Sequence, residues 1–176
     1  IRDRDSMAAK FGVNVTISAE AARPISVEST TPIGIAGYEE VLENGLHFFM
    51  TTAKALEALE AKYKAKKDAS QAFKKGSIYR ALKGIEDQAV NTQIILSVFT
   101  KDDDSDTNDE ITECKKAISE LTKAKSRFGY NPNLIIAPGF SHEDAVKGEI
   151  EKVATRLKAT GIVDLKAQDA AAAIVK

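Results

Sequence analysis

Tryptophan is absent from this chain of 176 residues, and cysteine occurs once, which excludes an intrachain disulfide framework. Neither charge sign dominates, because 25 lysines and arginines stand against 26 aspartates and glutamates. Without a basic excess we expect no nucleic-acid partner. No apolar run reaches the length of a membrane span, so we expect no membrane partner either. The single thiol, and the lack of a secretory leader before Met7, favour a reduced, cytoplasmic compartment.

The start of the chain predicts a strand that stands apart from the rest. We interpret residues 1–6 as an added remnant ahead of a natural start at Met7 and leave them out of the fold. Residues 11–18 alternate apolar and polar side chains, which is typical of a half-buried strand. Its apolar face would consist of Val13, Val15 and Ile17.

Residues 19–32 have weak structural signals and read as a linker. Pro24 and Pro32 bias the residues before them, Arg23 and Thr31, away from helix. A lone strand cannot satisfy its own hydrogen-bonding pattern. We therefore expect residues 7–32 to form an extended N-terminal arm and linker, whose strand pairs with a sheet elsewhere.

From residue 33 onward, apolar runs alternate with amphipathic helix patterns. We predict strands at residues 33–38, 46–52, 92–99, 133–139 and 162–165. We predict helices at about 53–66, 77–89, 109–127 and 142–159, followed by an Ala-rich helix at the end of the chain. Strands without polar alternation, separated by helices, predict an α/β domain over residues 33–176 with a mostly parallel sheet flanked by helices on both faces.

Local signals predict how several of these helices begin and end. Ser77 is an expected N-cap, and Ser141 and Asp144 are an expected capping pair. Gly129 and Gly161 are expected to end the helices before them. The only cysteine, Cys114, falls on an apolar helix face and is expected to be a buried small hydrophobic residue.

Candidate chemistry concentrates at "NPNLIIAPGFSHEDAV", residues 131–146, where a strand runs into a helix. An anion at that helix start would be repelled by Glu143 and Asp144, so we interpret the junction as structural. The two histidines, His47 and His142, lack a recognisable nucleophile or acid partner and are too few for a metal site. We predict no catalytic, metal-binding or cofactor-binding residues.

The acidic stretch after residue 99 has the ligand spacing of a calcium loop, from Asp102 at the first position to Glu113 at the twelfth. Its sixth position is Thr107, where the turn requires glycine, and a strand precedes it instead of a helix. We favour an incidental acidic surface loop and keep a calcium-responsive interaction domain as an alternative.

Phosphate-binding motifs are missing as well. No P-loop sequence occurs, and "GIAG" at residues 34–37 lacks the third glycine of a dinucleotide fingerprint. Lysines are dense near residues 62–75, a pattern of either a solvated face or an electrostatic surface for a partner. The cluster consists of Lys62, Lys64, Lys66, Lys67, Lys74 and Lys75.

The order of these segments resembles contractile phage tail sheath proteins, the group related to the P2-like and R-type pyocin sheaths. Residues 11–38, "FGVNVTISAEAARPISVESTTPIGIAGY", resemble their opening. "KKGSIYRALKGIEDQ", "TQIILSVF" with its acidic loop, and "PNLIIAPGFSHEDAVKGEIEKVATRLKATGIVDL" resemble later segments in the same order. The residues that match at the start are Gly12, Val13, Val15, Arg23, Pro24, Ile25, Ser29, Thr30, Ile33 and Gly34. Phe99 departs from the family, which has arginine after that strand, and family members continue well beyond this length.

The resemblance implies a structural subunit of a contractile tail sheath and no enzyme. Its strand Val13, Val15 and Ile17 would join a sheet in a neighbouring subunit, with Arg23, Pro24 and Pro32 in the hinge. The implied partners are other sheath subunits, the tail tube and the baseplate, in a virion tail assembled in the bacterial host cytoplasm. A type VI secretion-like sheath component is a close alternative. A doubly wound α/β enzyme or small-ligand binder, using Asp102, Ser141 or His142, is another.

Overall fold

The structure is a computed structural model, and it describes residues 31–71, 74–101 and 106–165. Within these residues a five-stranded sheet has the order β2-β3-β1-β4-β5. Its strands are β1 (Ile33–Tyr38), β2 (Gly45–Phe49), β3 (Ile94–Phe99), β4 (Leu134–Ile136) and β5 (Thr160–Ile162). β1, β3, β4 and β5 run parallel, and β2 is antiparallel to β3 at one edge. The predicted α/β class with a mostly parallel sheet is confirmed.

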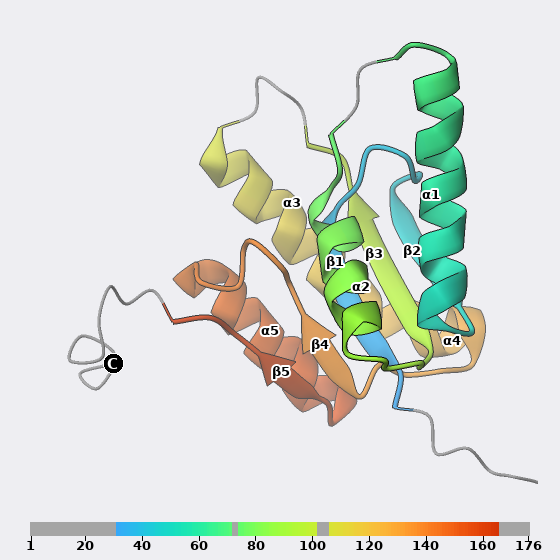
Figure 1. Ribbon diagram of the computed structural model, residues 1–176. Helices are drawn as coiled ribbons and strands as arrows, with labels where there is room; N and C mark the ends of the chain where they lie inside the picture. Colours follow the sequence, from blue (N-terminus) through green and yellow to red (C-terminus); the bar gives the residue numbers. More distant parts are fainter. Residues whose placement is uncertain (1–30, 72–73, 102–105, 166–176) are drawn as a thin grey trace, which may run out of the picture.

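Helices cover both faces of the sheet, as predicted (Figure 1). They are α1 (Thr52–Asp68), α2 (Ser77–Asp87), α3 (Thr107–Glu120), α4 (Ala124–Phe128) and α5 (Asp144–Leu157). α1 and α2 pack on one face, where Ile35 and Leu96 of the sheet meet Leu59 and Leu82. The remaining helices pack on the other face in a second apolar cluster.

The side-chain period of the strands explains why two cores form. Ile33 and Ile35 of β1 point into the cluster beneath α1 and α2, whereas Ala36 points into the opposite cluster. β3 behaves in the same way, and all of its residues are buried. A strand buried on both faces needs apolar residues at consecutive positions, which is the pattern that predicted these strands.

Several predicted boundaries were wrong. β2 ends at Phe49 because Thr51 caps α1, its side-chain oxygen accepting a hydrogen bond from the N–H of Lys54 at 3.2 Å. β3 begins at Ile94, two residues later than expected, and β4 spans only Leu134–Ile136. The helix expected over 109–127 is divided by a short 3₁₀ turn, Leu121–Lys123 (η2), before α4 ends at Gly129 in the left-handed conformation, as predicted for that glycine.

The end of α5 also differs from the prediction. The helix ends at Lys158 in the left-handed conformation, and Gly161 belongs to the next strand. A Cβ atom at Gly161 would lie 2.5 Å from Cγ2 of Ile150, so glycine is needed there for close packing of β5 on α5. β5 therefore occupies 160–162, and the strand expected at 162–165 was placed too late. The Ala-rich segment expected to be helical lies outside the described residues.

Candidate functional site

A buried carboxylate lies at the carboxyl end of the central strand. Glu39 follows β1 directly, and only 1% of its surface is exposed. Its Oε1 accepts a hydrogen bond from the Tyr63 hydroxyl and a second one, of 3.2 Å, from the backbone N–H of Glu40. Its Oε2 accepts from the N–H of Tyr79 at 3.3 Å. Burial raises the pKa of the Glu39 carboxyl, and these hydrogen bonds act in the opposite direction.

This Glu39 cluster connects β1, α1 and α2. Tyr79 is the third residue of α2, whose N-cap Gly76 has no side chain to offer, so Glu39 satisfies a free N–H of that helix from outside. The N–H of Gly76 donates to the Tyr63 hydroxyl at 3.0 Å. A Cβ at Gly76 would lie 2.3 Å from the carbonyl oxygen of Tyr38. Ser77 was predicted to cap this helix, but its hydroxyl instead accepts from the N–H of Tyr38 at 3.1 Å.

The chemistry available to this cluster is limited because its polar atoms bind one another. Burial and the hydrogen bond to Glu39 raise the pKa of the Tyr63 hydroxyl, so it is a donor at neutral pH. Sequence reasoning missed Glu39. The signal was an acidic residue directly after a buried apolar strand, where a carboxylate is rarely tolerated without partners.

The junction at residues 131–146 is structural in its described contacts. Ser141 is buried and donates to Asp164 Oδ2 at 2.6 Å, so it does not cap α5. The N-cap is Glu143, without a side-chain capping bond, and the predicted Ser141–Asp144 capping pair was wrong. His142 Nε2 lies 3.0 Å from Glu143 Oε1. Serine and histidine thus each bond to a different carboxylate, which is not the arrangement of a nucleophile with its base.

The other histidine also has a local partner. His47 lies in β2, and its Nε2 is 2.8 Å from the carbonyl oxygen of Glu43. Cys114 is fully buried in α3, as predicted, and burial raises the pKa of its thiol to about 12. A thiol with so high a pKa is a poor nucleophile at neutral pH.

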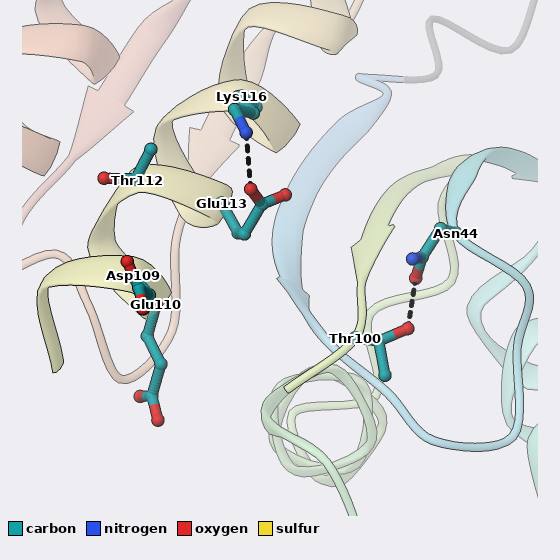
Figure 2. Close-up of a pocket in the computed structure, with 7 residues that line it drawn as sticks. All are labelled: Asn44, Thr100, Asp109, Glu110, Thr112, Glu113 and Lys116. Atoms are coloured by element: carbon teal, nitrogen blue, oxygen red, sulfur yellow. Dashed lines mark hydrogen bonds and ion pairs between the residues drawn. The ribbon is translucent and has the colours of Figure 1, made fainter. Parts of the chain in front are cut away.

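An acidic cavity of about 640 Å³ lies at the start of α3 (Figure 2). α3 contributes Asp109, Glu110 and Glu113, and the opposite wall has Asn44 and Thr100, which are joined by a hydrogen bond of 2.7 Å. The lining is completed by Thr112 and Lys116. Lys116 pairs with Glu113 at 2.5 Å, and Lys101 pairs with Glu110 at 2.5 Å. The cavity carries a surplus of negative charge.

The second half of the expected calcium loop is helical. Asp106 is the N-cap of α3, and its Oδ1 accepts from the N–H groups of Asn108 at 2.7 Å and Asp109 at 3.0 Å. Thr107 to Glu113 then follow the helix instead of wrapping around a point. Among residues 31–71, 74–101 and 106–165, no three or more His, Cys, Asp or Glu side chains gather in a way that could hold a metal ion. Asp102 and Asp104 lie outside the described residues.

The predicted lysine cluster lies at the far end of α1 and before α2. Lys66 pairs with Glu40 at 3.7 Å, and the Lys75 Nζ lies 4.1 Å from the centre of the Tyr79 ring. Lys62, Lys64 and Lys67 are exposed, and none of them forms an ion pair with another described residue. Figure 1 shows this end of α1 and the start of α3 at the same end of the molecule.

Of residues 7–32, assigned to the arm and linker, only Thr31 and Pro32 are described. The carbonyl oxygen of Pro32 accepts from the N–H of Asn133 at 2.8 Å, and the preceding carbonyl, of Thr31, accepts from the Thr92 hydroxyl at 2.8 Å. The chain is therefore fixed to the sheet from residue 31 onward. Val13, Val15, Ile17, Arg23 and Pro24 lie outside the described residues, and the structure brings none of them to a site.

Taken together, the described residues form an α/β domain with charged surfaces. Within the described residues, no helix is both long and apolar enough to span a membrane. No protein-family model matches the chain. The chain is 29% identical over 160 residues to a Pseudomonas aeruginosa (strain UCBPP-PA14) protein named "Putative prophage major tail sheath protein". The match covers 87% of this chain and 39% of that protein. The chain is thus similar to part of a protein that is named as a tail sheath protein, and it spans about two fifths of that protein's length.

Proposed function

We propose that this chain is part of a structural subunit of a contractile tail sheath, which polymerises around a tail tube and drives injection by contraction. The observation that carries the proposal is the similarity to a tail sheath protein over 87% of the chain. That relative is much longer, since the chain spans 39% of its length. The proposed partners are neighbouring sheath subunits, the tail tube and the baseplate, and the proposed location is the virion tail.

The proposed N-terminal arm lies ahead of the described domain. A share of 87% of 176 residues is about 153 residues, whereas residues 31–176 number only 146. The match therefore includes at least about seven of the first 30 residues. An extended strand that adds to the sheet of a neighbour gains affinity from backbone hydrogen bonds, and alternating side chains set its register. Val13, Val15 and Ile17 would have that task.

The described domain suits a body that moves as a unit. Apolar clusters join the sheet to helices on both faces, and the Glu39 cluster ties β1 to α1 and α2. In our proposal the linker of residues 19–32 connects this body to the arm, with Arg23 and Pro24 in the hinge and Pro32 at its fixed end on the sheet. Contraction is then a switch between two packings of whole subunits, held together by exchanged strands.

The experiment that tests this proposal is negative-stain electron microscopy of the full-length protein, with and without Val15→Asp. We expect tubes or rings from the wild type and unlinked subunits from Val15→Asp, because a carboxylate cannot enter the apolar side of the added strand. Thr16→Asp, on the opposite face of the predicted strand, is the matched control and should assemble. Normal tubes from Val15→Asp would refute strand exchange, and a wild type that stays monomeric would refute the sheath role.

A further inference from the structure

Charge is unevenly distributed over the described domain. The chain as a whole has a net charge of −1. Residues 62–75 nevertheless contain six lysines and one aspartate, whereas residues 106–113 contain four carboxylates and no lysine or arginine. We call these the lysine surface (Lys62, Lys64, Lys66, Lys67, Lys74 and Lys75) and the acidic surface (Asp106, Asp109, Glu110 and Glu113).

The fold places the two surfaces at the same end of the sheet, over opposite faces. β3 runs toward the start of α3, so the acidic surface lies at the carboxyl end of the parallel strands. α1 follows the antiparallel β2 and returns to that end, where Tyr63 reaches Glu39 just after β1. α1 belongs to one apolar cluster and α3 to the other. Figure 1 shows the two helix ends at the same end of the molecule.

Charges on both surfaces remain available. Lys62, Lys64 and Lys67 are exposed on the last turns of α1 and form no ion pair with another residue of the described part. On the acidic surface, Asp109 is exposed and likewise forms no ion pair with any described side chain. Internal pairing within one copy therefore leaves a positive surplus at α1 and a negative surplus at α3.

Position adds to the charge argument. Asp109, Glu110 and Glu113 of the acidic surface line the cavity of about 640 Å³ that Figure 2 shows in close-up. Four of the six lysines of the lysine surface lie in the second half of α1, and the other two precede α2. Long, exposed lysine side chains can reach carboxylates that line a cavity, and salt weakens the attraction between them.

We propose that the two surfaces are the halves of one contact between copies of this chain, the lysine end of α1 in one copy docking in the acidic cavity of the next. Because the two halves differ, the contact is head-to-tail, and repeating it generates a ring or a helical row. The inference rests on the proposed sheath role only in that the partner is a second copy of the chain.

The test is sedimentation velocity in about 0.01 M and about 1 M NaCl, where the Debye length falls from about 30 Å to about 3 Å. The lysine variant carries Lys62→Glu, Lys64→Glu and Lys67→Glu, and the acidic variant carries Asp109→Lys and Glu113→Lys. We expect the wild type to associate in low salt and to dissociate in high salt. Each variant alone should associate at least tenfold more weakly, and an equimolar mixture of both should recover association, since each then offers the charge that the other lacks.

A matched control reverses three exposed lysines elsewhere, Lys123→Glu, Lys125→Glu and Lys152→Glu, with the same change in net charge. It should keep more of the low-salt association than the lysine variant, and circular dichroism confirms the fold of each protein. A wild type that stays monomeric in low salt, a lysine variant that associates as well as the wild type, or a mixture without recovery overturns the inference. Binding of heparin to the lysine surface, while the chain alone stays monomeric, would also overturn the inference.

Repeating the measurement in a Val15→Asp background separates this contact from the arm. The charged contact should persist there, because neither surface includes the arm. If the full-length protein forms no tubes but the charged association persists, the proposed function fails and this inference stands. If tubes form and the lysine variant assembles as the wild type does, the proposed function stands and this inference fails.

Discussion

Replacing Glu39 by alanine removes the acceptor on which two buried donors depend. The Tyr63 hydroxyl and the N–H of Tyr79 both donate to its carboxylate, and only 1% of the Glu39 surface is exposed. A buried donor left without a partner costs about 1–3 kcal/mol, and the Tyr63 hydroxyl keeps a long contact of 3.5 Å to the carbonyl oxygen of Lys74, so Glu39→Ala should lower the free energy of unfolding by about 1–6 kcal/mol. The N–H of Glu40 is omitted from this sum because it is only partly buried and can bind water.

The pH dependence has a definite sign. Because burial raises the pKa of Glu39 above its ordinary value of 4.5, the folded chain retains this proton in a range where the unfolded chain has lost it. Folding takes up a proton in that window, so the contribution of Glu39 to stability declines as the pH rises through it. The free energy of unfolding of the wild type minus that of Glu39→Gln should therefore be larger near pH 4.5 than at neutral pH.

Urea unfolding followed by far-ultraviolet circular dichroism measures these differences. The free energy of unfolding of a small protein falls by about 1–3 kcal/mol for each molar increase in urea. Glu57→Gln is the control: Glu57 pairs with Lys54 on the exposed side of α1, and its loss should leave the midpoint unchanged. Tyr63→Phe combined with Glu39→Ala should cost less than the sum of the two single changes, since each single change removes the same hydrogen bond between the two side chains. An unchanged midpoint for Glu39→Ala, or a difference from Glu39→Gln that grows with pH, would refute the reasoning.

Three further predictions concern single side chains. Gly76→Ala should destabilise the fold by about 1–3 kcal/mol, because its Cβ would lie 2.3 Å from the Tyr38 carbonyl oxygen. Gly84→Ala should stabilise α2 by up to about 1 kcal/mol, because nothing lies within 4 Å of its Cβ. Thermal melts that show Gly76→Ala to be the more stable of the two variants would contradict this. Cys114, with a pKa of about 12, should resist a disulfide reagent until the chain is unfolded, and rapid labelling of the native protein would disprove its burial. Asp106→Ala should lower the free energy of unfolding by about 1 kcal/mol, because it removes the N-cap of α3. Asp106→Asn should retain most of that stability, because asparagine is also a good N-cap. Equal melting temperatures for the two variants would exclude the cap.

The order and type of the elements could be predicted largely because the central strands β1 and β3 are buried on both faces. β1 was predicted at the residues where it lies, since "IGIAGY" has no polar position and ends at a charged pair. The direction of β2 could not be predicted, because hydrophobic pattern carries no information on pairing. The short connection from β1 does not permit a helical crossover, and β2 pairs with β3 in the antiparallel direction.

Side-chain roles were predicted less well because they depend on contacts between distant residues. Ser141 resembles an N-cap locally, but Asp164, 23 residues later, takes its hydroxyl. Ser77 resembles one as well, yet its hydroxyl accepts from Tyr38, 39 residues earlier. Glu39 was missed for the same reason, since its partners Tyr63 and Tyr79 belong to two different helices. Cys114 was predicted correctly because helical spacing alone determines which face it lies on.

The two edges of the sheet differ in how readily a further strand could be added. β2 forms one edge, and its residues are partly or fully buried. The ring of Phe48 stacks with those of Phe128 and Tyr130, with ring centroids 5.6 Å and 5.2 Å apart. β5 forms the other edge, and all three of its residues are exposed, as are Val163 and Leu165 after it. Backbone groups on that bare side have no neighbouring strand among the described residues. Any widening of this sheet, by more of the polypeptide or by another molecule, meets less obstruction on the β5 side.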